Sequence, residues 1–240
     1  MFLKDVVIRS SEFPTRTVYP FNLAVFQQSS RITFKTPVTF FVGENGSGKS
    51  TLLTAITRKC GIHIWQAKNG RRVDQNPYEE ALHHFIDVRW EEGPVPGSFF
   101  ASQIFQNFSR ILDEWAAADP GLLEYFGGRS LMTQSHGQSI LSFFRSRFQV
   151  RGIYFLDEPE TALSPKSQIK LLGLLAELSR SGNAQFLVAS HSPILLACPD
   201  SRIYSFDSVP VSTVAYEETD YYRTYRDFLE NRERFIRGGE

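Results

Sequence analysis

Residues 43–51 read GENGSGKST, a glycine-rich loop between an apolar run and a segment with helical character. The loop fits the pattern G-x-x-x-x-G-K-S/T, in which glycines let the backbone wrap a phosphate while N–H groups and a helix N-terminus point at the anion. Lys49 supplies a compact positive charge for the β- and γ-phosphates, and Ser50 offers a hydroxyl to Mg²⁺. The loop therefore predicts a nucleoside triphosphate site, but it does not distinguish a kinase, a GTPase or a mechanical ATPase. The residues predicted to bind the nucleotide are Gly43, Glu44, Asn45, Gly46, Ser47, Gly48, Lys49, Ser50 and Thr51.

Two later apolar strands end in residues that suit phosphate chemistry. Residues 153–158 read IYFLDE, and ligands of α/β sheets bind where such strands end. We expect Asp157 to hold Mg²⁺ and Glu158 to face the attacking water as a general base or orienting acceptor. The strand at 185–190 (QFLVAS) is followed by His191, which can donate to the γ-phosphate or to the attacking water. The alternatives are solvated acids at a strand end and a structural histidine.

Strands alternate with helices through the second half of the chain, which favours an α/β fold with a mostly parallel sheet. The first 42 residues read as strands with turns. In the helix expected at 165–181, we predict a buried face of Ile169, Leu172, Leu175 and Leu178. The other expected elements are helices at 49–59, 78–84 and from about 135, an amphipathic helix through Ile104, Phe108, Ile111 and Trp115, strands at 85–90 and 98–101, and a tail of two strands and a polar helix at 217–236.

The composition excludes several classes of protein. The 240 residues hold 26 Lys plus Arg and 26 Asp plus Glu, so the zero net charge argues against a broad coat for polyanions. No apolar run approaches the roughly 20 residues that span a bilayer, and the N-terminus lacks a signal-peptide core. Two cysteines, Cys60 and Cys198, do not make a disulfide framework. We therefore expect a cytoplasmic protein without membrane insertion.

Residues 134–138 read QSHGQ and resemble the signature motif of ATP-binding-cassette (ABC) ATPases, which is usually LSGGQ. Four motifs follow that family's order: GENGSGKST resembles Walker A, QSHGQ the signature, YFLDEPETALSP Walker B with the D-loop, and ASHSP the switch histidine. The resemblance covers about residues 31–206 and is particularly to small stand-alone bacterial ATPases related to the SMC, RecF and OLD types. It implies one ABC-type ATPase domain over 1–240, with helices on both faces of the sheet, N-terminal antiparallel strands and a helical signature subdomain inserted at about 102–150.

The same resemblance implies Mg²⁺-dependent ATP hydrolysis and a head-to-tail homodimer around two ATP molecules. Each loop around Lys49 would face the partner's signature residues Ser135, His136, Gly137 and Gln138. Ser135 can cap a helix, so that its hydroxyl and the following N–H groups bind a γ-phosphate in trans. An ordinary helix N-cap is the alternative.

The sequence departs from the family pattern in several places. Gln134 and His136 replace the usual Leu and first Gly of the signature, and the D-loop-like residues 161–164 lack the terminal Asp, which leaves their cross-dimer contact open. Gln103 is expected to be the glutamine that contacts metal and water, with Gln106, Gln66 and Gln75 as alternatives. An aromatic that stacks on adenine is expected from Tyr19 or Phe21, with core packing as the alternative for either.

The effector on which such an ATPase acts stays open. One interpretation is a soluble ATPase that acts on DNA in maintenance or defence, and a second is the nucleotide-binding subunit of an ABC transporter. A third is an ATP-gated regulator of an unidentified protein partner. The basic residues that could bind DNA phosphates form two clusters, Arg58, Lys59, Lys68, Arg71 and Arg72, and Arg145, Arg147 and Arg151, for which solvated charge is the alternative.

Overall fold

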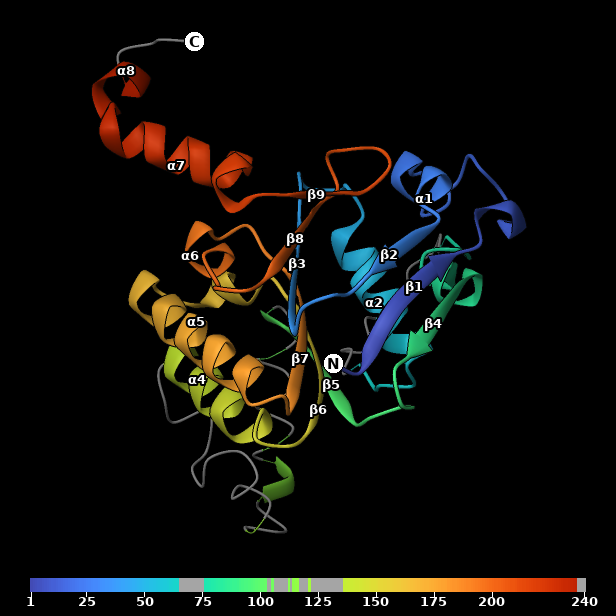
Figure 1. The fold of residues 1–240 in the computed structure, drawn as a ribbon, viewed down its shortest axis with the longest axis horizontal. Helices are drawn as coiled ribbons and strands as arrows, with labels where there is room; N and C mark the ends of the chain where they lie inside the picture. The colour runs from blue at the N-terminus through green and yellow to red at the C-terminus, as the bar shows by residue number, and fades with distance from the viewer. Residues whose placement is uncertain are drawn as a thin grey trace.

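The computed structural model describes residues 1–64, 76–102, 105, 112, 114–116, 121 and 136–236. Its centre is a six-stranded sheet in which five neighbouring strands run parallel and an edge strand runs antiparallel. In spatial order the strands are β5 (Gly97–Ala101), β6 (Gly152–Asp157), β7 (Ala184–Ala189), β3 (Val38–Val42), β8 (Arg202–Ser205) and β9 (Ser212–Val214), as Figure 1 shows. The predicted α/β class with a mostly parallel sheet is confirmed.

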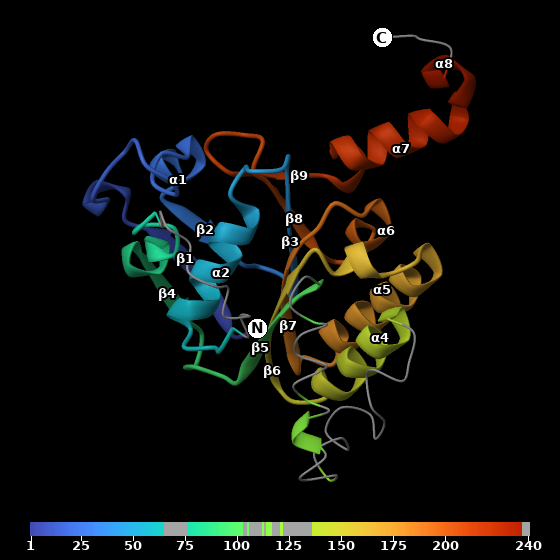
Figure 2. The same ribbon diagram turned by 180° about the vertical axis from the view of Figure 1, so that it is seen from behind.

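Helices cover both faces of this sheet (Figures 1 and 2). One face holds α2 (Lys49–Lys59), and the other holds α4 (His136–Arg147), α5 (Pro165–Arg180) and α6 (Pro193–Leu196). In β3, Phe41 packs into the apolar cluster that contains the side chains of α2, whereas Phe40 and Val42 pack into the cluster of α4 and α5. A strand buried on both faces is mostly apolar, which is why VTFFV, whose single polar residue Thr39 is also buried, shows no alternation of buried and exposed positions.

A smaller antiparallel sheet lies beside α2, with the order β2 (Arg31–Thr33), β1 (Leu3–Ile8) and β4 (Ile86–Trp90). The buried Gln185 side chain of β7 joins this sheet to the central one. Its Oε1 accepts from the backbone N–H groups of Phe2 and Leu3, both at 2.7 Å, and its Nε2 donates to the Leu3 carbonyl at 2.9 Å. One amide thus satisfies three backbone groups that burial would otherwise leave without partners.

The buried face of α5 differs from the predicted one. Ile169 is 58% exposed, and the helix buries Leu171, Leu175, Ala176 and Leu178. An α-helix turns about 100° per residue, so positions that repeat strictly every three residues drift around its axis. Ile169 and Leu178, nine residues apart, consequently lie on opposite sides of the helix.

Other elements depart from expectation in detail. The segment expected to be a helix at 78–84 is a turn followed by the 3₁₀ helix Ala81–Phe85, and the N-terminal region includes a short helix, α1 (Ala24–Gln28). The polar tail helix is broken at Asn231 into α7 (Asp220–Glu230) and α8 (Arg232–Ile236), which extend away from the sheet in Figure 1. None of the helices in the described ranges combines the length and apolar character that crossing a bilayer requires.

Candidate functional site

The predicted catalytic and binding residues meet at one edge of the central sheet. Parallel pairing places Phe41 of β3 and Asp157 of β6 on either side of Ala189 of β7. The glycine-rich loop, the acidic pair and His191 all follow these strand ends. The topology therefore brings together three segments that are more than 30 residues apart in sequence.

The glycine-rich loop needs glycine for two different reasons. Gly43, Gly46 and Gly48 all have positive φ angles, of 141°, 81° and 105°. A Cβ on Gly48 would also lie 2.8 Å from Cζ of the buried Phe26 ring, whereas a Cβ on Gly46 would meet nothing within 4 Å. Backbone conformation thus restricts Gly46, and both conformation and packing restrict Gly48.

Lys49 is folded into its own loop. Its Nζ donates to the carbonyls of Gly43 at 2.6 Å and Glu44 at 2.8 Å, with the Ser47 hydroxyl at 3.5 Å. Burial lowers the pKa of Lys49, and the nearby carboxylate of Glu158 opposes that shift. The ammonium lies at the centre of the loop, where the pattern predicts contact with phosphates.

Two oxygen-bearing side chains, those of Ser50 and Asp157, lie together beneath the loop. The Ser50 hydroxyl donates to Asp157 Oδ1 at 2.7 Å. Burial raises the pKa of Asp157 to about 6; the Ser50 hydrogen bond opposes this shift and the charge of Glu158 adds to it. The pair provides one hydroxyl and one carboxylate oxygen, the donor set that Mg²⁺ takes beside substrate phosphates.

Glu158 follows directly in a strained conformation. Its φ of 45° lies in the left-handed region, and its N–H donates to the Ala189 carbonyl at 2.9 Å. Hydroxyls of Ser102 and Thr161 both donate to its carbonyl at 2.9 Å. These contacts stabilise a conformation that costs on the order of 1–3 kcal/mol, and they set the direction of the Glu158 side chain.

That side chain meets His191. Glu158 Oε1 lies 3.3 Å from His191 Nε2, yet Nε2 is buried and has no partner in hydrogen-bond geometry among the described residues. Burial lowers the pKa of His191, and the charge of Lys49 lowers it further, while Glu158 opposes both. The carboxylate and the imidazole therefore lie side by side, 3.3 Å apart, outside good hydrogen-bond geometry.

Two residues of the site were not found from the sequence. Glu160 Oε1 accepts from the Ser190 hydroxyl at 2.9 Å and from the N–H of His191. The Tyr221 hydroxyl contacts His191 Nδ1 and donates to the Gly43 carbonyl at 2.8 Å. Glu160 lies in the segment YFLDEPETALSP, where an acid after the Asp157–Glu158 pair was the available signal, but Tyr221 lies in a tail that carries no motif.

Tyr19 and Phe21 have different environments. The Tyr19 hydroxyl is hydrogen-bonded to Thr51, and its ring lines a hollow of about 210 Å³ together with Gly46, Lys49 and other loop residues. Phe21 is fully buried against Phe13, Tyr78 and Phe85, so it is a core residue and the suggestion that it stacks on adenine was wrong. Tyr19 stays the candidate.

Part of the predicted signature, and every glutamine considered for contact with metal and water, lies outside the described residues. These positions are Ser135, Gln134, Gln103, Gln106, Gln66 and Gln75. His136 and Gly137 begin α4, and a Cβ on Gly137 would lie 3.6 Å from the carbonyl of Ala162. The first turn of α4, which also contains Gln138, is therefore next to the D-loop-like segment of the same chain.

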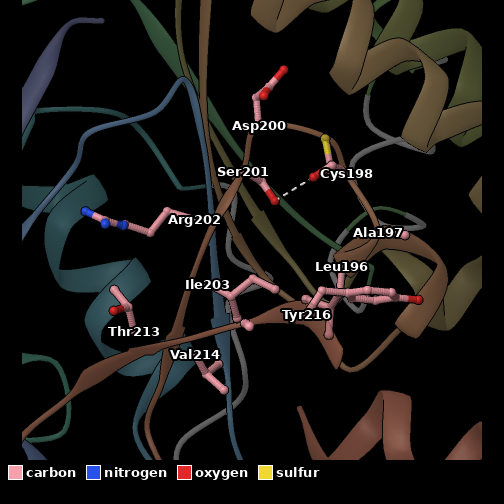
Figure 3. A pocket seen from close by; sticks show the side chains of 11 residues that line it. Leu196, Ala197, Cys198, Asp200, Ser201, Arg202, Ile203, Thr213, Val214 and Tyr216 are labelled. Carbon is pink, nitrogen blue, oxygen red and sulfur yellow. Dashed lines mark hydrogen bonds between the residues drawn. The ribbon is translucent and has the colours of Figure 1, made fainter. Parts of the chain in front are cut away.

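A separate hollow of about 420 Å³ lies between α6 and strands β8 and β9 (Figure 3). Leu196, Ile203 and Tyr216 line it, and the Ser201 hydroxyl on its rim donates to the Cys198 carbonyl at 2.7 Å. Arg202, another lining residue, begins β8, whereas the glycine-rich loop follows the end of the parallel strand β3. The larger hollow therefore lies away from the phosphate chemistry.

The basic clusters are largely neutralised where they are described. Arg58 pairs with Glu80 at 2.7 Å, Lys59 with Asp87 at 3.6 Å and Arg151 with Glu92 at 3.9 Å. Arg147 donates to the Gly97 carbonyl at 3.4 Å, and Arg145 is exposed. Lys68, Arg71 and Arg72 lie outside the described residues.

Family models match two parts of the chain. A model described as "AAA domain, putative AbiEii toxin, Type IV TA system" matches residues 131–197, and one described as "AAA domain" matches residues 21–74. The first match includes the signature-like segment, the acidic strand end and His191. The second includes the glycine-rich loop.

Relatives and a solved structure extend these matches. The chain is 27% identical over 198 residues to the "Probable siderophore transport system ATP-binding protein YusV" of Bacillus subtilis. The matched region covers 71% of this chain and 70% of YusV. It is 24% identical to the "Petrobactin import ATP-binding protein FpuD" of Bacillus anthracis, over 68% of this chain and 65% of FpuD. A structure described as "An inward-facing conformation of a putative metal-chelate type ABC transporter" has 18% identity and a TM-score of 0.53, covering 94% of this chain and 88% of that one. This likeness shows a shared fold.

Proposed function

Since the chain is an ABC-class P-loop ATPase that binds and hydrolyses ATP, we propose that its reaction uses Mg²⁺ held by Ser50 and Asp157. The supporting observation is the 2.7 Å contact between these two oxygens directly beneath the glycine-rich loop. The ion would supply positive charge to the β- and γ-phosphate oxygens. Asp157 would bind it as a carboxylate, so metal binding would also counter the raised pKa of this group.

We assign Lys49 to the phosphates and Glu158 to the attacking water. Lys49 holds two loop carbonyls, and a triphosphate would exchange these contacts for its own oxygens. Glu158 is directed to the site by its left-handed backbone and by the Ser102 and Thr161 hydroxyls on its carbonyl. In this arrangement catalysis is mostly positioning and charge stabilisation.

We further propose that two copies of the chain close around two ATP molecules. In one chain, Gly137 at the start of α4 lies against Ala162 of the D-loop-like segment, so both segments proposed to meet a partner are adjacent. The helix N-terminus there would provide N–H groups to a γ-phosphate bound in the partner.

The test is the pair of variants Glu158→Gln and Glu177→Gln. Glu177 is exposed on α5, so its variant controls for the loss of a carboxylate. We expect Glu158→Gln to retain ATP binding, to lose at least 100-fold in turnover, an order-of-magnitude figure for a group that activates water, and to accumulate an ATP-dependent dimer in sedimentation velocity. Wild-type turnover in Glu158→Gln would contradict the assignment to water. Sedimentation as a monomer at every ATP concentration would contradict the sandwich.

Specific observations favour two of the three effectors that the sequence left open. Action on DNA in maintenance or defence is the first, and it is supported by the exposed Arg145, which a dimer would present twice. A transporter subunit is the second, because YusV and FpuD are described as ATP-binding proteins of transport systems. Binding of the ATP-bound dimer to DNA at low salt would favour the first candidate, and copurification with a membrane permease the second.

A further inference from the structure

One tyrosine of the C-terminal tail, Tyr221, lies at the edge of the central sheet where the candidate site is. Tyr221 lies in the first turn of α7, 30 residues beyond His191, and its hydroxyl contacts both His191 Nδ1 and the Gly43 carbonyl. The Tyr221 and His191 rings meet edge to face, with centroids 5.0 Å apart and planes at 85°. One hydroxyl thus connects the glycine-rich loop to the histidine that follows β7.

The direction of the Tyr221 hydroxyl proton determines which ring nitrogen of His191 bears a hydrogen. We assign the single phenolic proton of Tyr221 to the Gly43 carbonyl, which lies 2.8 Å away, can only accept and also accepts from Lys49 Nζ. Burial raises the pKa of Tyr221 to about 12, which keeps that proton on the phenol. The phenolic oxygen then has only lone pairs for His191, so Nδ1 must bear a hydrogen to bond with it.

The surroundings of Nε2, the other ring nitrogen of His191, agree with a hydrogen on Nδ1. In a neutral imidazole with hydrogen on Nδ1, Nε2 is an acceptor and cannot bond to a carboxylate oxygen. Nε2 is indeed buried and has no hydrogen-bond partner among the described residues, although Glu158 Oε1 is 3.3 Å away. A hydrogen on Nε2 could reach Glu158 only if the carboxylate turned into hydrogen-bond geometry.

The Tyr221 hydroxyl is well anchored. The Thr219 side chain is buried, accepts from the Tyr222 N–H at 3.3 Å and donates to the Tyr216 carbonyl at 2.7 Å, which fixes the start of α7. The Tyr216 hydroxyl donates to the Pro193 carbonyl at 3.0 Å, two residues beyond His191. The start of the tail is therefore bound to the same segment that carries the histidine.

We propose that Tyr221 is a positioning residue that holds His191 in the tautomer with hydrogen on Nδ1, so that Nε2 presents a lone pair beside Glu158. Neutral His191 then accepts a hydrogen bond from the attacking water. The sequence predicted His191 as a donor, to the γ-phosphate or to the attacking water, and either role requires a hydrogen on Nε2, which would be a second proton on this ring. The kinetic consequence rests on the proposed function, whereas the tautomer is a property of the nucleotide-free chain.

The tautomer can be measured directly by ¹⁵N NMR on the full chain labelled at histidine, without nucleotide at pH 8. The chain has five histidines, and the His191 signals are those lost in His191→Gln. We expect hydrogen on Nδ1 in the wild type. In Tyr221→Phe, which keeps the ring and removes the acceptor, we expect the hydrogen to move toward Nε2, where Glu158 can accept it. Tyr222→Phe, on the next residue of the same helix, is the control and should leave the spectrum unchanged.

Hydrolysis assays supply the second readout. We expect Tyr221→Phe to lower kcat about tenfold, within the range that orienting partners of a histidine contribute, with KM for ATP within twofold and Tyr222→Phe near wild type. Hydrogen on Nε2 in the wild type would overturn the proposal, whether or not any variant folds. A lower kcat with an unchanged tautomer would also overturn it. Absence of hydrolysis in the wild type would instead contradict the proposed function and leave the spectra to decide the tautomer.

Discussion

Replacing Asp157 with asparagine should stabilise the metal-free protein while removing its activity. Burial raises the pKa of Asp157 from 3.8 to about 6, so the folded chain binds this proton more tightly than the unfolded chain does. Stability therefore decreases as the pH rises from about 4 to about 6, and it stays reduced at higher pH. The asparagine side chain would carry no charge to desolvate, and its amide oxygen could still accept from Ser50.

The size of the effect follows from the shift. Each pKa unit corresponds to about 1.4 kcal/mol, so a rise of about two pKa units lowers the free energy of unfolding by about 3 kcal/mol. For a chain of this length that is about 6–12 °C in Tm. We expect this difference between Asp157→Asn and the wild type at pH 7.5 in EDTA, and none at pH 3.5.

The assay is thermal unfolding followed by circular dichroism across this pH range. Addition of Mg²⁺ with a non-hydrolysable ATP analogue should raise the Tm of the wild type more than that of the variant, because only the wild type keeps the carboxylate ligand. Equal Tm values for both proteins at pH 7.5 in EDTA would show that burial does not penalise this carboxylate. A lower Tm for the variant at that pH would refute the reasoning.

Three further predictions concern other parts of the chain. Gln185→Leu removes the side chain that pairs three buried backbone groups, and it should lower the free energy of unfolding in urea by about 3 kcal/mol or more. The control, Gln28→Leu on the exposed end of α1, should change it by less than about 0.5 kcal/mol. Similar values for both variants would contradict the role of Gln185 as a link between the sheets. Gly48 has a positive φ, and a Cβ there would lie 2.8 Å from a ring carbon, so Gly48→Ala should weaken nucleotide binding at least tenfold in calorimetry. At Gly173 a Cβ meets nothing within 4 Å, so the control Gly173→Ala should stabilise α5 by about 1 kcal/mol. Arg145→Glu should weaken low-salt DNA binding of the ATP-bound dimer in fluorescence anisotropy and reduce its salt dependence; equal affinity would exclude this surface, and no binding by the wild type would exclude DNA.

The strongest local patterns in the sequence predicted the right elements. The glycine-rich loop lies between a buried strand and a helix, and each apolar run expected to be a parallel strand is one. These elements were predictable because glycine spacing, strand burial and helix capping depend on neighbouring residues. The face of α5 was predicted wrongly at Ile169, since a spacing of three residues matches several helical faces and only packing selects one.

The sequence by itself determined the class of protein and the chemistry of its loop and strand ends. Only the tertiary structure decided how those groups are held: the Ser50–Asp157 contact, the approach of Glu158 to Nε2 of His191 and the hydroxyl of Tyr221 between two distant segments. The physical reason is that a hydrogen bond depends on positions in space within about 3 Å. A residue such as Tyr221, which is 178 positions from Gly43, leaves no periodic or spacing signal for that contact until the chain has folded.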